Sequence, residues 1–187
     1  MFELAFIEQN YNGQHISERK AVRGVVFHHG KLLMINDISN TVKFPGGGIE
    51  SNEDHYSALK REIAEETGYI NFRIIRLLGK TIQQKLDMND DKKLFRMISY
   101  YYLCELLDEE NIGTTLDQYE EDLHFKCQFM TIAQAIKQNE QNDTIDSSLF
   151  KWAKRELAVL HELKKGNLDR DKDLRINLNK TEAIGDL

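Results

Sequence analysis

The 187-residue chain has little proline and little cysteine. Its one proline, Pro45, stands directly before three consecutive glycines, and this run is the strongest turn signal in the sequence. Cys104 and Cys127 lie in apolar or mixed segments and show no CxxC spacing. We therefore expect two free thiols in a reducing, cytoplasmic compartment rather than the disulfide of a secreted domain.

Long apolar runs and an excess of positive charge are also lacking. No stretch approaches the ~20 apolar residues that span a bilayer, and the first ten residues do not resemble a signal peptide. The formal net charge is −6, whereas non-specific nucleic-acid binding needs clustered cations. We expect no membrane and no nucleic acid as partner. A small phosphorylated substrate remains compatible with the charge, because a bound metal supplies local positive charge.

Apolar residues make up 41% of the chain, which is enough for one hydrophobic core with appendages. Their periodicity predicts a hairpin over 21–36 that turns at 28–31, strands over 41–45, 69–86, 95–106 and 123–130, and helices over 54–67, 131–138 and 145–164. This order predicts an α/β or α+β fold in which helices pack on the faces of a mixed sheet.

The chain is expected to divide into three parts. These are a main domain over 1–142, a C-terminal helix over 143–165 and a charged tail over 166–187. The helix either packs on the domain or forms the interface of a homodimer. In the tail Leu174, Ile176 and Leu178 alternate with polar residues, so an edge strand and a mobile tail are the two alternatives.

Three glutamates lie close together on the helix expected over 54–67. At ~100° per residue from Glu62, Glu66 falls at about +40° and Glu65 at about −60°, so the acidic arc borders the apolar stripe that contains Ile63. Like charges at this spacing repel one another. A hard divalent cation such as Mg²⁺ would convert the repulsion into binding. The alternative is a solvated helix in which Arg61 simply pairs with Glu65.

The ends of this helix carry ordinary signals. Ser51 or Asn52 is expected to cap its start, and Gly68 is expected to end it. The glycines at 46–48 let the backbone turn tightly and approach a ligand closely. They are therefore candidates for contacts with a metal or a phosphate, and an ordinary turn is the alternative.

The stretch from Gly47 to Tyr69 resembles the Nudix box. In that pattern a glycine is followed after five residues by Glu, and after seven more by Arg-Glu-U-x-Glu-Glu-x-Gly-U, where U is a bulky apolar residue. Gly47, Glu53 and the segment 61–69, REIAEETGY, fill every one of these positions. Phe44-Pro45-Gly46 is also similar to the family's usual approach to the box.

The resemblance implies a Nudix-like α/β/α sandwich around a mixed β-sheet, here with a C-terminal helical extension. It implies that water attacks the diphosphate of a nucleoside diphosphate linked to another moiety, with Mg²⁺ or Mn²⁺ as cofactor. Nucleotide sugars, dinucleoside polyphosphates and nucleoside triphosphates all stay open as substrates. Lys85-Leu86 stands where the ADP-ribose group tends to place a proline, which disfavours that substrate. The alternative function is a non-catalytic nucleotide-binding sensor on the same fold.

Carried over position by position, the resemblance also implies a set of site residues. The implied metal ligands are Gly47, Glu62, Glu65 and Glu66. The implied catalytic residues are Glu53, Arg61, Glu62 and Glu66, with Arg61 orienting the carboxylates through Glu53. The general base stays open between Glu62, Glu53 and a later acid, here Glu120, Glu121 or Asp122. The candidate substrate-binding residues are Arg23, Lys43, Gly46 and Gly48, and a surface or edge-strand role is the alternative for the two cations.

Overall fold

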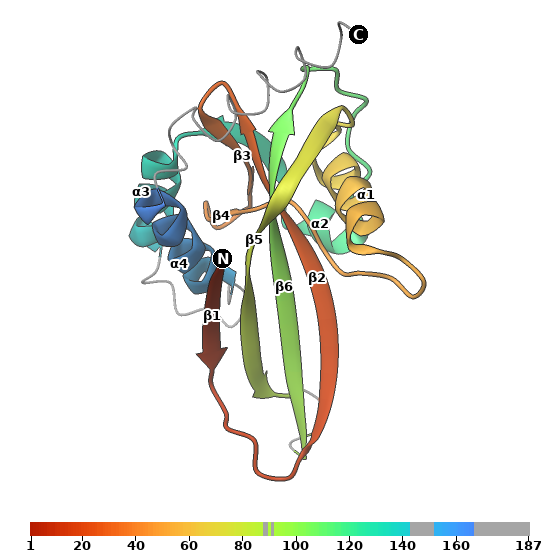
Figure 1. The fold of residues 1–187 in the computed structure, drawn as a ribbon, viewed down its shortest axis with the longest axis vertical. Helices are drawn as coiled ribbons and strands as arrows, with labels where there is room; N and C mark the ends of the chain where they lie inside the picture. The colour runs from red at the N-terminus through yellow and green to blue at the C-terminus, as the bar shows by residue number, and fades with distance from the viewer. Residues whose placement is uncertain (88–89, 91, 143–151, 167–187) are drawn as a thin grey trace, which may run out of the picture.

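A mixed seven-stranded sheet forms the centre of the protein (Figure 1). The computed structural model describes residues 1–87, 90, 92–142 and 152–166. Its elements are β1 (Phe2–Ile7), β2 (His15–His28), β3 (Lys31–Asn36), β4 (Val42–Lys43), α1 (His55–Thr67), β5 (Phe72–Leu86), β6 (Lys93–Leu106), α2 (Gln118–Asp122), β7 (Lys126–Met130), α3 (Ile132–Asn142) and α4 (Trp152–Lys165). The strand order is β1-β5-β6-β2-β3-β4, and β7 pairs with β3. The pairs β1–β5 and β2–β6 are parallel, and the other pairs are antiparallel.

Both faces of the sheet are covered, because successive side chains of a strand point to opposite faces. In β2, Val25 and Phe27 belong to a core shared with α3 and α4, whereas Val26 belongs to a second core with α1. In β6, Leu103 and Cys104 divide between the same two cores. Figure 1 shows α3 and α4 on one side of the sheet and α1 on the other. The predicted sandwich around a mixed sheet is therefore confirmed.

Two elements were not anticipated from the sequence. Strand β1 pairs in parallel with β5, with Phe2 opposite Gly79. Helix α2 lies inside the stretch 107–122, which reads as an acidic loop. It forms because the Asp117 side chain accepts from the Glu120 backbone N–H while the Glu120 side chain accepts from that of Asp117. This reciprocal cap satisfies two backbone donors that a short helix would otherwise leave open.

The start of α1 differs from the expectation that Ser51 or Asn52 caps it. Asp54 is the N-cap: its backbone is extended, and its side chain accepts from the Ser57 N–H at 2.7 Å. Ser51 and Asn52 instead form a turn before the helix, with Asn52 at a φ of 71°. Gly68 ends the helix in the left-handed conformation, as predicted.

Helix α1 sits close against β2 because Gly24 has no side chain there. A Cβ on Gly24 would lie 2.7 Å from Cδ1 of Ile63, which is fully buried. Ala58 and Leu59, one turn earlier, are fully buried in the same core. This packing fixes the rotation of α1, so its glutamates face the loop that follows β4.

The described part of the C-terminal helix packs on the domain. In α4, Val159, Leu160 and Leu163 are buried in the core that also contains Phe27. The part of the expected helix over 143–151, and the tail from 167 with its expected edge strand, lie outside the described residues. The chain's C-terminal helical extension is thus a structural part of the sandwich from Trp152 onward.

Cys104 and Cys127 are free thiols, as predicted. Among the helices of the described residues, none combines the length and the apolar character that a bilayer span requires.

We predict that Ile63→Ala lowers the free energy of unfolding by about 2–5 kcal/mol, because it leaves a cavity between α1 and β2. Urea denaturation followed by circular dichroism measures this change. Lys60→Ala on the exposed side of α1 is the control and should stay within about 0.5 kcal/mol of wild type. Equal stability of the two variants would contradict the packing described for α1.

Candidate active site

The carboxylate of Glu66 is buried at the centre of the site. The residue is 2% exposed. One oxygen accepts from Lys43 Nζ at 2.6 Å, and the other accepts from the Gly46 backbone N–H at 2.6 Å. A buried charge is tolerated only when it is paired and hydrogen-bonded. Glu66 therefore ties α1 to β4 and to the glycine loop.

Arg61 connects the other acids of the helix and loop. It donates to both oxygens of Glu53, at 3.0 and 2.9 Å, and to Glu62 at 2.9 Å and Glu65 at 3.1 Å. It also donates to the Gly48 carbonyl at 3.1 Å. The hydrogen bond to Glu53 comes first among the causes that raise the pKa of Arg61 and lower that of Glu53. The ion pair between Arg61 and Glu65, which was the alternative to a cation site, does form. It is one contact of a wider network around Arg61.

Gly47 lies directly against the carboxylate of Glu62. A Cβ at Gly47 would stand 2.2 Å from Oε2 of Glu62, so only glycine leaves room for this carboxylate. Burial is the main cause that raises the pKa of Glu62; the hydrogen bond from Arg61 opposes it, and the charge of Glu66 adds to it. The Gly47 carbonyl accepts from the Val22 N–H at 3.0 Å, and its second lone pair remains for another partner.

These residues suit a hard divalent cation. Four carboxylates, those of Glu53, Glu62, Glu65 and Glu66, share only two cationic partners, Arg61 and Lys43, within the described residues. The surplus is two negative charges, and the available donors are oxygens, which Mg²⁺ and Mn²⁺ prefer. Glu65 is the most accessible of the acids, with 40% of its side chain exposed. The site is thus short of positive charge where the implied ligands meet.

Of the three later acids, the structure brings only Glu120 toward the cluster. Its pKa is raised to about 7, mainly by burial; the Asp117 hydrogen bond opposes the shift, and the charge of Glu66 adds to it. Glu121 and Asp122 are exposed on α2. Among the later acids, Glu120 therefore has the environment expected of a proton acceptor near neutral pH.

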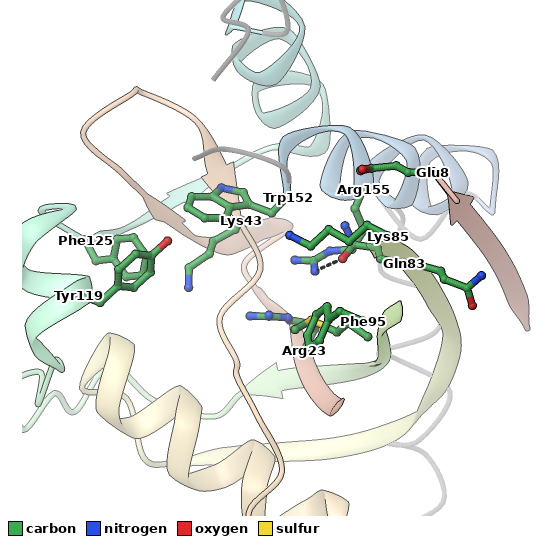
Figure 2. Close-up of a pocket in the computed structure, with 12 residues that line it drawn as sticks. Glu8, Arg23, Lys43, Gln83, Lys85, Phe95, Tyr119, Phe125, Trp152 and Arg155 are labelled. Carbon is green, nitrogen blue, oxygen red and sulfur yellow. Dashed lines mark hydrogen bonds between the residues drawn. The ribbon is translucent and has the colours of Figure 1, made fainter. Parts of the chain in front are cut away.

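A cavity of about 270 Å³ adjoins the acidic cluster. Its lining comprises Glu8, Arg23, Lys43, Gln83, Gln84, Lys85, Phe95, Met97, Tyr119, Phe125, Trp152 and Arg155. Figure 2 shows these side chains converging from the sheet, from α2 and from α4. Lys43 belongs to both regions, because its ammonium contacts Glu66 and lies 4.1 Å from the ring centre of Phe125.

Arg23 and Lys43, the two cations expected to bind phosphate, are both buried rather than on the surface, at 8% and 9% exposure. Arg23 donates through Nη1 to the carbonyl of Gly46, and this hydrogen bond links β2 to the glycine loop. Gly48 is held by Arg61 and therefore faces the acidic network rather than the cavity. The structure thus divides the expected substrate-binding residues between two adjoining regions.

Several cavity residues were missed by the analysis of the sequence. Lys85 and Phe95 lie on β5 and β6, and Trp152 and Arg155 lie on α4. None belongs to a local motif, since strands and a helix far apart in the chain bring them together. The one available signal was the helix expected over 145–164, which contains Trp152 and Arg155.

Comparison with known proteins relates the chain to one family. A family model for the NUDIX domain matches residues 18–153. A search of the curated proteins gives no match. Among solved structures, a UDP-X diphosphatase is 18% identical with a TM-score of 0.50, over 85% of this chain and 66% of that chain. This chain therefore spans slightly less than two thirds of that protein, and the likeness at this identity shows the fold alone.

Two further solved structures are similar to this chain with TM-scores below 0.50. An ADP-ribose pyrophosphatase from Streptococcus suis 89-1591 is 16% identical with a TM-score of 0.44, over 62% of this chain and 75% of that chain. A NUDIX hydrolase from Nitrosomonas europaea is 16% identical with a TM-score of 0.48, over 76% of this chain and 90% of that chain.

We predict that Gly47→Ala weakens Mn²⁺ binding by ~10–100-fold, because the new methyl group forces the Glu62 carboxylate out of position. Isothermal titration with Mn²⁺ measures the affinity, and circular dichroism checks that the fold is kept. Glu50→Gln is the control, since it removes an exposed carboxylate beside the loop that makes no contact with α1 acids among the described residues. An unchanged affinity in Gly47→Ala would rule out Glu62 as a ligand.

Proposed function

Because the chain belongs to the Nudix family, whose members act on phosphorus-containing anhydrides, we propose that it is a metal-dependent pyrophosphohydrolase. Its substrate is a nucleoside diphosphate linked to another moiety, and its cofactor is Mg²⁺, with Mn²⁺ as a substitute. The observation that carries this proposal is the surplus of two negative charges on a preorganised set of four carboxylates, of which that of Glu66 is buried. A purely structural network would be expected to balance its charges.

The residues of the chain take distinct parts in this reaction. Glu62, Glu65 and Glu66, with the Gly47 carbonyl, would hold the cation. When bound, a divalent cation supplies neutralisation of the phosphate charge and a lower pKa for a coordinated water. Arg61 keeps the carboxylates in place through its fork of donors. The reacting diphosphate would lie across the glutamates toward the Gly46 end of the loop.

Glu120 is the general base that we favour. Glu53 is a poor acceptor, because the two-pronged contact with Arg61 lowers its pKa. Glu62 is occupied by Arg61 and by its implied role as a ligand. Glu120 has a pKa of about 7 and its charge interacts with both Glu66 and Lys43. It can therefore take a proton from the attacking water and release it to solvent at neutral pH.

A phosphate-release assay against nucleotide sugars, ADP-ribose, dinucleoside polyphosphates and nucleoside triphosphates tests the function. We expect turnover of at least one class with Mg²⁺, and its complete loss in EDTA with recovery on added Mg²⁺. Glu65→Gln should lose activity while keeping its stability, because that side chain is partly exposed. Nucleotide binding without turnover of any class would instead support a non-catalytic sensor.

A second experiment tests the base. As a base, Glu120 must be deprotonated, so kcat should fall as the pH drops through about 7. Glu120→Gln should lower kcat by ~10²–10⁴-fold and remove this acidic limb. Glu121→Gln, an exposed neighbour on the same helix, is the control and should keep both the rate and the limb. If Glu120→Gln keeps the wild-type pH profile, the general base is another acid.

A further inference from the structure

The charged residues that line the cavity are four cations, Arg23, Lys43, Lys85 and Arg155, and one exposed acid, Glu8. Arg23 and Arg155 are both buried there, at 8% and 3% exposure. Arg155 donates to Gln83 at 2.8 Å and, through Nε, to Glu156 at 2.9 Å (Figure 2 shows the contact with Gln83). Glu156 is the carboxylate that pairs with Arg155, so this guanidinium is compensated.

Arg23 has no carboxylate partner of its own within the described residues. Its Nη1 donates to the Gly46 carbonyl, and its Nε is buried without a hydrogen-bond partner. Burial and the neighbouring charge of Arg155 both lower the pKa of Arg23. A buried guanidinium with an open donor is costly unless an anion completes it. An anion in the cavity that Arg23 lines would supply the missing partner.

Lys85 adds a second uncompensated cation at the wall. Its ammonium lies 6.0 Å from the ring centre of Phe95, and no carboxylate within the described residues pairs with it. Lys43 differs from it, because Glu66 already neutralises that ammonium. In Figure 2 the cationic groups lie between Trp152 on one side and Phe95 on the other. Such apolar walls strengthen any charge interaction made between them.

We propose that this cavity binds a further phosphate group of the substrate, beyond the diphosphate that is cleaved; this inference rests on the proposed function. The site lies on the far side of Lys43 from the α1 glutamates, toward β5 and α4. Its volume of about 270 Å³ falls below the ~300–1,000 Å³ of pockets that enclose whole ligands, so it suits one part of a substrate. The preferred substrates are then polyphosphorylated, such as dinucleoside polyphosphates or nucleoside triphosphates, over sugar nucleotides with a neutral sugar.

Binding of inorganic phosphate in EDTA tests the site without any catalysis. Trp152 is the only tryptophan of the chain and lines the cavity, so its fluorescence reports on occupancy. We expect a saturable change, with the affinity about tenfold weaker in Lys85→Gln and restored in Lys85→Arg. Lys80→Gln on the same strand is the control and should bind as wild type, since Lys80 pairs with Glu3 outside the cavity. No saturable change, or equal affinity in wild type and Lys85→Gln, overturns the proposal.

Steady-state kinetics with Mg²⁺ then separates the two proposals. Lys85→Gln should lower kcat/KM about tenfold for a dinucleoside tetraphosphate, through KM, and less than twofold for UDP-glucose. An equal loss for both substrates overturns the phosphate site. If the wild type hydrolyses nothing in the panel, the proposed function fails, while the fluorescence titration still decides whether the cavity binds phosphate.

Discussion

The buried carboxylate of Glu66 is the contact on which the rest of the site depends. It accepts from Lys43 on β4 and from the backbone of Gly46, so one side chain joins the helix, the strand and the glycine loop. The close packing of Ile63 over Gly24 brings that carboxylate to its place. This carboxylate contact acts together with the hydrogen bond from Arg61 to the Gly48 carbonyl, so two side chains of α1 hold the loop against the helix.

Surplus negative and surplus positive charge lie on opposite sides of the contact between Glu66 and Lys43. On the α1 side, acids outnumber their cationic partners, and on the cavity side Arg23 and Lys85 outnumber theirs. An elongated ligand that presents phosphates to both sides would satisfy each surplus in turn, through a cation on one side and directly on the other. Helix α1 and the loop before it carry the acidic half, whereas Arg23 on β2, Lys85 on β5 and Arg155 on α4 form the cationic half.

The parts that the sequence could predict are those set by local spacing. Glu62, Glu65 and Glu66 lie at fixed offsets on one helix, so the approach of Glu62 and Glu66 to the apolar stripe followed from helical geometry, and Gly68 ended the helix as expected. The cap was misplaced because Ser51, Asn52 and Asp54 are all good caps, and only the loop geometry chooses among them. The cavity was missed because Arg155 reaches it only when α4 docks on the sheet, and α2 was missed because five residues give too short a pattern.

Lys43 stands between the two halves, and this position has a thermodynamic consequence. A cation bound at Glu66 would compete with the Lys43 ammonium for the same carboxylate, and an anion in the cavity would attract that ammonium from the other side. Each ligand would then free the charged group that the other contacts, so the two would bind with positive coupling. By linkage such a coupling is reciprocal: bound metal would raise the affinity for phosphate by the same factor by which bound phosphate would raise the affinity for metal. Each ligand would then bind more weakly alone than when both arrive as a metal–polyphosphate complex.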